Sequence, residues 1–117
     1  MRVVGIDPGL RTTGYGVLDG EAQQVALVEA GTVTADESDE TPLRLRCIHD
    51  DVLDVLRDAR ADAVAVEKLY AHYSHPTTAI VMGHARGVIL LAAAECGVPV
   101  VDYPATMIKR SLTGNGH

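Results

Sequence analysis

The chain has 117 residues, which is enough for one small domain, and 47% of them are hydrophobic. The longest strictly apolar run, residues 88–94, is too short to cross a bilayer, and the N-terminus shows no basic-then-apolar signal, so we expect a cytoplasmic protein. The net charge of −6 is uneven: residues 1–67 carry 6 basic and 14 acidic side chains, whereas residues 68–117 carry 4 basic and 2 acidic ones, so a polyanion should favour the second part.

The beginning of the chain predicts three short strands joined by tight turns, which is typical of an antiparallel meander. We expect the strands over residues 2–7, 14–18 and 24–34, with Asp19 and Gly20 as the turn after the second one. The acidic stretch that follows, residues 35–40 (ADESDE), is predicted to be a solvated loop.

A helix is expected next, with Thr41 as its N-cap and Pro42 at the first helical position. Its apolar residues recur at helical spacing: Leu45, Ile48, Val52, Val55 and Ala59.

Strands and helices alternate over the rest of the chain. The expected elements are a strand over 63–67, a long helix over 74–96 ended by Gly97, a strand over 98–103 and a short helix over 104–112. This order predicts an α/β fold with a mixed five-stranded sheet flanked by helices, in which the strands after the meander run parallel to the first.

Two of the predicted strands end in a carboxylate, Asp7 and Glu67. Pro8 and Gly9 fit the centre of a type II turn that would end the first strand at Asp7. If the two strands are parallel neighbours, both acids lie at the same end of the sheet. Each acid is preceded two positions earlier by a small residue on the same face, Gly5 or Ala65, which leaves room above the sheet.

Two neighbouring carboxylates without a basic partner repel each other, and a divalent cation such as Mg²⁺ or Mn²⁺ would resolve this. Two such ions ~3.5–4 Å apart can activate water and stabilise the leaving oxygen in phosphodiester cleavage. The alternative is that one or both acids only cap turns at the surface.

The glycines after Asp7 also suggest phosphate loops, and these interpretations fail on particular residues. Gly9 and Gly14 have Walker A spacing, but Tyr15 stands where that motif has its Lys, and Asp19 stands where a dinucleotide fingerprint has its last Gly. The opening also looks like the first phosphate loop of sugar kinases and actin-like ATPases, which need a second lobe.

Four blocks resemble the RuvC crossover junction endodeoxyribonucleases in order and spacing: GIDPGLRTTGYGV, AVEKLY, MGHARGVILLAA and YPATMIKRSLTGNG. The resemblance implies a single ribonuclease H-like nuclease domain over residues 1–117 and a homodimer that cuts two opposed strands of a four-way DNA junction. It also implies two Mg²⁺ ions per complete active site, a branch-migration motor as partner, and a role in recombination and repair.

The resemblance assigns roles to particular positions. Asp7 and Glu67 match metal-binding catalytic acids of the family. Tyr70 falls where the family stacks an aromatic residue on bases, although it could instead pack on its own domain. Lys109 falls on a basic position near the DNA backbone, although an exposed Lys can also be simply solvated. Arg11, beside Asp7, is a further candidate for a phosphate contact.

The long helix is thin on one side, where its small residues are Gly83, Ala85, Gly87 and 92–94. It corresponds to a helix that contributes to the dimer of the family, and packing on its own sheet is the alternative. The chain stops inside the last block, so we expect it to lack the family's last helix, which bears the remaining carboxylates. We therefore expect the 117-residue chain alone to cleave slowly or not at all. The competing hypotheses are a non-catalytic junction-binding dimer and an actin-like or sugar-kinase-like ATP-binding domain.

Overall fold

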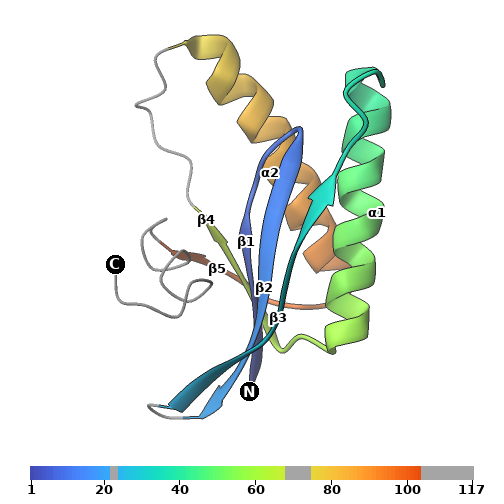
Figure 1. Ribbon diagram of the computed structural model, residues 1–117. Helices are drawn as coiled ribbons and strands as arrows, with labels where there is room; N and C mark the ends of the chain where they lie inside the picture. The colour runs from blue at the N-terminus through green and yellow to red at the C-terminus, as the bar shows by residue number, and fades with distance from the viewer. Residues whose placement is uncertain (22–23, 68–74, 104–117) are drawn as a thin grey trace.

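The strands of the chain form one mixed sheet in the computed structural model, which describes residues 1–21, 24–67 and 75–103. The sheet has five strands in the order β3-β2-β1-β4-β5 (Figure 1). In chain order the elements are β1 (Arg2–Asp7), β2 (Thr12–Glu21), β3 (Gln24–Thr34), α1 (Thr41–Ala59), β4 (Ala63–Glu67), α2 (Pro76–Glu95) and β5 (Val100–Tyr103).

Strand directions agree with the predicted topology. β1, β2 and β3 pair antiparallel as a meander, whereas β4 pairs parallel with β1, and β5 pairs parallel with β4. The parallel strands are separated by helices, as a crossover connection requires. The prediction of an α/β fold with a mixed five-stranded sheet is therefore confirmed.

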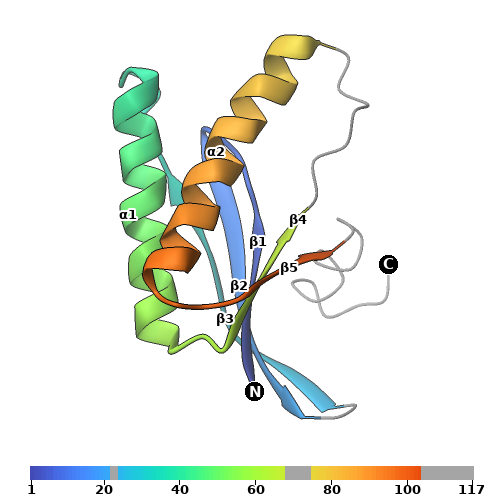
Figure 2. The same cartoon turned by 180° about the vertical axis from the view of Figure 1, so that it is seen from behind.

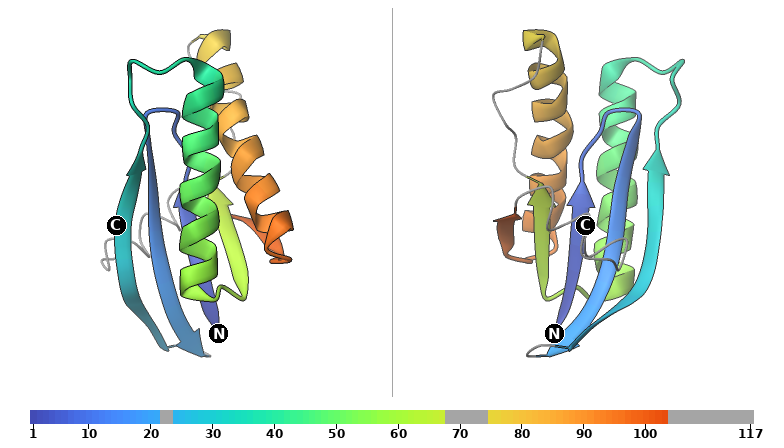
Figure 3. Two further views of the ribbon diagram at one scale, coloured as in Figure 1. Left: turned by 90° about the vertical axis from the view of Figure 1, so that its right-hand side faces the viewer. Right: turned by 60° about the vertical axis from the view of Figure 1, so that its left-hand side comes forward.

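Both helices lie on one face of the sheet, and this face carries the core (Figures 2 and 3). Alternate residues of the two central strands point to the helices and are fully buried: Val4, Ile6, Val64 and Val66. The helices meet them with Ile48, Val52 and Leu56 of α1 and with Ala85, Ile89, Ala92 and Ala93 of α2. Burying each of the larger aliphatic side chains stabilises the fold by about 1.5–3 kcal/mol.

β2 is longer than the sequence pattern predicts. Asp19 and Gly20 lie inside the strand, paired with Ala26 and Val25 of β3, rather than in a turn. The N-terminal amine also donates a hydrogen bond to the Gly20 carbonyl. The predicted turn at these residues is thus wrong, because strand pairing on both sides outweighs their local preference for turns.

Helix ends differ from prediction by one or two residues. Glu40 holds the N-cap position of α1 without a side-chain cap bond, and Thr41 is already helical. Leu45 and Val55 are only half-buried, while Leu56 lies in the core. α2 begins at Pro76 and is followed by Cys96 as C-cap and by Gly97, whose φ of +68° suits glycine. The short helix expected over 104–112 lies outside the described residues.

α2 is long and apolar enough, by length and composition alone, to cross a membrane. In the fold, however, its residues Ala85, Ile89, Ala92 and Ala93 are fully buried in the core. One side of α2 thus packs into the core, whereas apolar residues on its other side, such as Ile80 and Leu91, are exposed.

Candidate active site

Asp7 and Glu67 end two neighbouring parallel strands. The register of β1 on β4 runs from Val3 beside Ala63 to Ile6 beside Val66. The next residue of each strand is the acid, and both acids are half-buried. Two carboxylates 60 positions apart in the sequence are thereby brought to one end of the sheet, as the strand pattern predicted.

The acids project from the face of the sheet that α1 and α2 leave uncovered. Ile6 and Val66, which precede them, point to the helices, so the alternation of side chains turns Asp7 and Glu67 the other way. The residues that share their face near the strand ends are small: Gly5, Gly14, Gly16, Ala63 and Ala65. These residues add little side-chain bulk beside the acids, although Gly5, Ala63 and Ala65 are themselves buried.

The connection after Asp7 is held by a side chain rather than by a type II turn. Gly9 does not have the positive φ that such a turn requires, so that prediction is wrong. Instead, the hydroxyl of Thr13 accepts a hydrogen bond from the Gly9 amide at 3.2 Å and donates one to the Gly9 carbonyl at 2.8 Å. Glycine is required there because a Cβ would lie 2.2 Å from the Thr12 carbonyl oxygen.

Glu67 is anchored from the helix side of the sheet. Its carboxylate atom Oε2 is buried, and its carbonyl oxygen accepts a hydrogen bond from Nε of Arg86 at 3.3 Å. Sequence reasoning missed Arg86. The sequence feature that could have identified Arg86 is its isolation, because it is the only Lys or Arg in α2, a mostly apolar helix.

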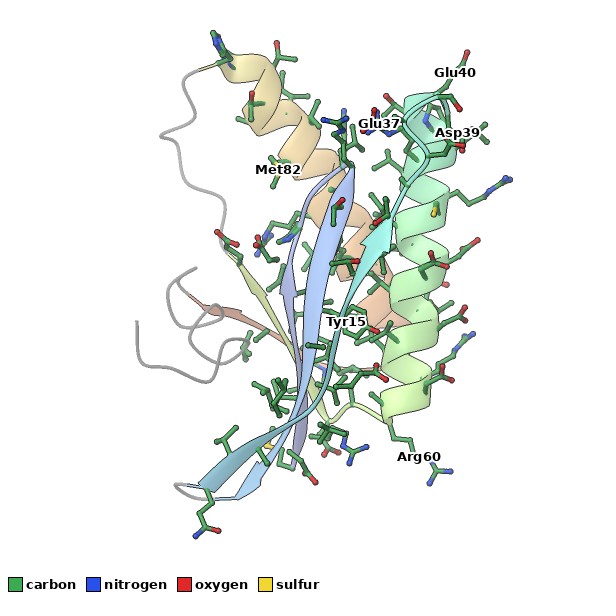
Figure 4. The ribbon with its side chains drawn as sticks, viewed as in Figure 1. Tyr15, Glu37, Asp39, Glu40, Arg60 and Met82 are labelled. Carbon is green, nitrogen blue, oxygen red and sulfur yellow. The ribbon has the colours of Figure 1, made fainter. Side chains whose placement is uncertain are left out.

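Arg11, predicted to contact phosphate, forms an ion pair with Glu37 of the acidic loop. The loop starts beside it, because the Ala35 amide donates to the Arg11 carbonyl at 2.9 Å. Figure 4 shows Glu37, Asp39 and Glu40 gathered near the start of α1. Hydrogen bonds from the amide and hydroxyl of Ser38 lower the pKa of Asp36.

The oxygens of Asp7 and Glu67 are the hard ligands that Mg²⁺ and Mn²⁺ prefer, and they lie on adjacent strands. The donor set therefore fits such ions as a partial site. No group of three or more His, Cys, Asp or Glu residues comes together among the side chains that the structure describes, which do not include those of Glu21 and Asp102. Tyr70 and Lys109, predicted to contact DNA, lie outside the described residues.

Comparison with known families decides the relationship. The family model described as "Crossover junction endodeoxyribonuclease RuvC" matches residues 3–117. The chain belongs to the RuvC family. A relative of that name from Rhodopirellula baltica is 51% identical over 97% of the chain, and one from Ehrlichia chaffeensis is 38% identical over 100% of it. The chain spans 64% and 74% of their lengths, respectively.

Solved structures agree with membership of the RuvC family. Thermus thermophilus RuvC in complex with Holliday junction substrate superposes with a TM-score of 0.85 at 37% identity, covering 100% of this chain and 71% of the other. The yeast mitochondrial Holliday junction resolvase Ydc2, at 9% identity and a TM-score of 0.62, covers 97% of this chain and 58% of the other, and shares the fold alone. The fold is ribonuclease H-like, as predicted.

Proposed function

We propose that this chain is the nuclease domain of a metal-dependent endonuclease, which resolves four-way DNA junctions by paired phosphodiester hydrolysis in recombination and repair. The observation that carries the proposal is the placement of Asp7 and Glu67 side by side at the end of the sheet, on the face that α1 and α2 do not cover. Membership of the RuvC family, and a junction-bound relative at 37% identity, support DNA junctions as the substrate.

In this proposal Asp7 and Glu67 hold Mg²⁺, or Mn²⁺, as two ions in the complete site. When bound, such ions activate water and stabilise the charge on the leaving oxygen. The chain's own residues position the carboxylates. The backbone of β1 and β4 sets their separation, and the Thr13 hydroxyl holds the loop that leaves Asp7.

Basic and aromatic side chains outside the carboxylate pair would hold the DNA. Arg11 lies four positions after Asp7 and is 66% exposed, so a phosphate can reach its guanidinium. Lys109 is proposed as a second phosphate contact, and Tyr70 as a stacking platform for a base at the opened junction. Phosphate contacts of this type position the DNA without reading its sequence.

Paired cuts need two active sites, and α2 offers a surface for a homodimer. Its side opposite the core carries a stripe that includes apolar and small residues at helical spacing: Ile80, Gly87, Leu91 and Ala94. Ile80 and Leu91 are 60% and 53% exposed. A Cβ added at Gly87 would meet nothing within 4 Å, so another helix can approach closely there. We also propose that the protein is cytoplasmic and assembles with a branch-migration motor.

The number of ligands limits what the 117-residue chain does alone. Residues 68–74 and 104–117 contain no Asp or Glu, and no larger ligand cluster forms among the described side chains, which leave out Glu21 and Asp102. Asp7 and Glu67 would leave most positions around two octahedral ions to water. We therefore propose that this chain by itself cleaves slowly, because its ions are weakly held and the attacking water is poorly placed.

The proposal is tested with a labelled four-way junction and Mg²⁺, using the 117-residue chain and the product of the complete gene. The complete product is expected to make paired nicks, and Asp7→Asn to slow them by about a hundredfold or more, since metal ions supply several kcal/mol. Asp54→Asn makes the same change at an exposed position of α1 and should leave the rate unaltered.

Two results would contradict the proposal. The first is an absence of Mg²⁺-dependent nicking together with tight, metal-independent junction binding, which would identify a non-catalytic binding dimer. The second is unimpaired nicking by Asp7→Asn. Rapid cleavage by the 117-residue chain would overturn only the statement that its ligand set is insufficient.

A further inference from the structure

Arg86 is a charged residue on the inner side of an apolar helix. It follows the fully buried Ala85, lies one turn before the fully buried Ile89, and is itself half-buried. Placing a guanidinium at the margin of an aliphatic core is unfavourable unless the group is well paired. Arg86 therefore needs a contact that offsets the hydration that its guanidinium loses.

One such contact joins Arg86 to the last residue of β4. Nε donates to the Glu67 carbonyl oxygen at 3.3 Å, between residues 19 positions apart. The carbonyl and the carboxylate leave the same residue, so a bond that holds the carbonyl also restricts the direction of the Cα–Cβ bond. The contact thereby ties α2, on one face of the sheet, to a carboxylate on the other.

The location of this contact matters because β4 ends there. On the side of β1 the register of β4 stops at Val66, so Glu67 lies at the margin of that pairing, whereas on the other side Glu67 pairs with Tyr103 of β5. A guanidinium is permanently charged, and hydrogen bonds from ionised donors are stronger than neutral ones.

We infer that Arg86 is a positioning residue for Glu67, holding the end of β4 so that the Glu67 carboxylate stays beside Asp7 for metal binding. This inference rests on the proposed nuclease function. Arg86 donates to the backbone carbonyl of Glu67, and the role inferred from this contact is to orient a ligand rather than to act on the substrate. Removing such an orienting group typically weakens metal binding or activity by about 10- to 100-fold.

The experiment measures Mn²⁺ binding by electron paramagnetic resonance of the free ion, without DNA, in the product of the complete gene. Arg86→Met is expected to raise the Mn²⁺ dissociation constant by about tenfold or more. Arg86→Lys keeps the charge but not the planar guanidinium, so it should produce a smaller rise. In both variants the Mg²⁺ concentration needed for half-maximal junction cleavage should rise, and metal-free junction binding should stay unchanged.

Ala85→Gly is the matched control for stability, because it loosens the adjacent turn of α2 without removing the contact to Glu67. It should lower the melting temperature and leave Mn²⁺ affinity unchanged. If Ala85→Gly weakens Mn²⁺ binding as much as Arg86→Met does, the role of Arg86 is merely structural and the inference is overturned. If Arg86→Met does not fold, Arg86→Lys decides, and wild-type Mn²⁺ affinity in that variant overturns the inference.

Glu67→Gln separates this inference from the function on which it rests. Loss of Mn²⁺ binding and of cleavage in Glu67→Gln, with wild-type behaviour in Arg86→Met, would remove the inference and leave the proposed function intact. Unaltered Mn²⁺ binding and cleavage in Glu67→Gln would instead remove the proposed function at this site.

Discussion

Arg11, four positions after Asp7, forms an ion pair with Glu37 in the loop that precedes α1. Both side chains are about two-thirds exposed, at 66% and 67%. Such a pair contributes only ~0–1 kcal/mol, so a DNA phosphate can displace the carboxylate. If Arg11 contacts DNA as proposed, Glu37 competes with a DNA phosphate for its guanidinium.

Glu37→Gln is accordingly expected to strengthen binding to a four-way junction at low salt. Freeing Arg11 and removing one repulsive charge should lower the dissociation constant by up to about fivefold, the equivalent of ~1 kcal/mol. Fluorescence anisotropy with a labelled junction measures the effect. Glu40→Gln removes a charge from the same loop without releasing Arg11, and should change affinity less. Equal gains from the two variants would show that the Arg11 pair is irrelevant.

Thr13→Val is expected to destabilise the protein although it preserves the shape of a fully buried side chain. Without the hydroxyl, the Gly9 amide and carbonyl lose their partner, at a cost of about 1–3 kcal/mol in the free energy of unfolding. Urea unfolding measures this loss. Thr13→Ser keeps the hydroxyl and should lose less, and the exposed Thr12→Val should change little. A loss in Thr12→Val equal to that in Thr13→Val would contradict this account.

Leu91→Glu is expected to dissociate the proposed homodimer while leaving the monomer folded, since Leu91 is 53% exposed and outside the core. Placing a charge in an apolar interface should raise the dimer dissociation constant by about tenfold or more. Analytical ultracentrifugation gives that constant. Val28→Glu changes an equally exposed residue (53%) on β3 and should leave the dimer intact. Dissociation of the dimer by Val28→Glu but not by Leu91→Glu would show that the interface lies on the β2–β3 hairpin instead.

His49 predicts a pH-dependent contribution to stability. Its Nδ1 lies 2.9 Å from an Asp50 oxygen and its Nε2 lies 2.7 Å from a Glu95 oxygen, which links α1 to the end of α2. Hydrogen bonds to the carboxylates of Asp50 and Glu95 raise the pKa of His49 above its ordinary value of 6.5. A raised pKa in the folded state means that the imidazolium stabilises the fold below that value, and that this stabilisation is lost as pH rises through the folded-state pKa.

Glu95→Gln should therefore lower the free energy of unfolding at about pH 5.5, where His49 is charged, and have little effect at about pH 9. The expected loss is about 0.5–1 kcal/mol, because Glu95 is 41% exposed and the pair is partly screened. Urea unfolding at the two pH values measures it. Asp58→Asn changes an exposed acid of α1 and serves as control. A loss in Glu95→Gln that is the same at both pH values would show that His49 is not the titrating group.

Much of the carboxylate site could be predicted from local patterns. Apolar runs ending at Asp7 and Glu67 indicated two buried strands, and side-chain alternation put each acid on the same face as Gly5 or Ala65. These inferences worked because strand periodicity is a property of a few consecutive residues. The roles of Asp7 and Glu67 in catalysis, and those of Tyr70, Lys109 and Arg11 in DNA binding, stay predictions.

By itself, then, the sequence determined the order of strands and helices, the core faces and the two strand-end acids, because the spacing of apolar residues follows the buried face of each strand or helix. Only the tertiary structure decided which polar groups meet: Arg86 with the Glu67 carbonyl, Arg11 with Glu37, and His49 with Glu95. These partners are 19 to 46 positions apart, and their contacts depend on how the helices and loops pack on the sheet. No repeating pattern in the sequence encodes that packing, so these contacts became visible only in the folded chain.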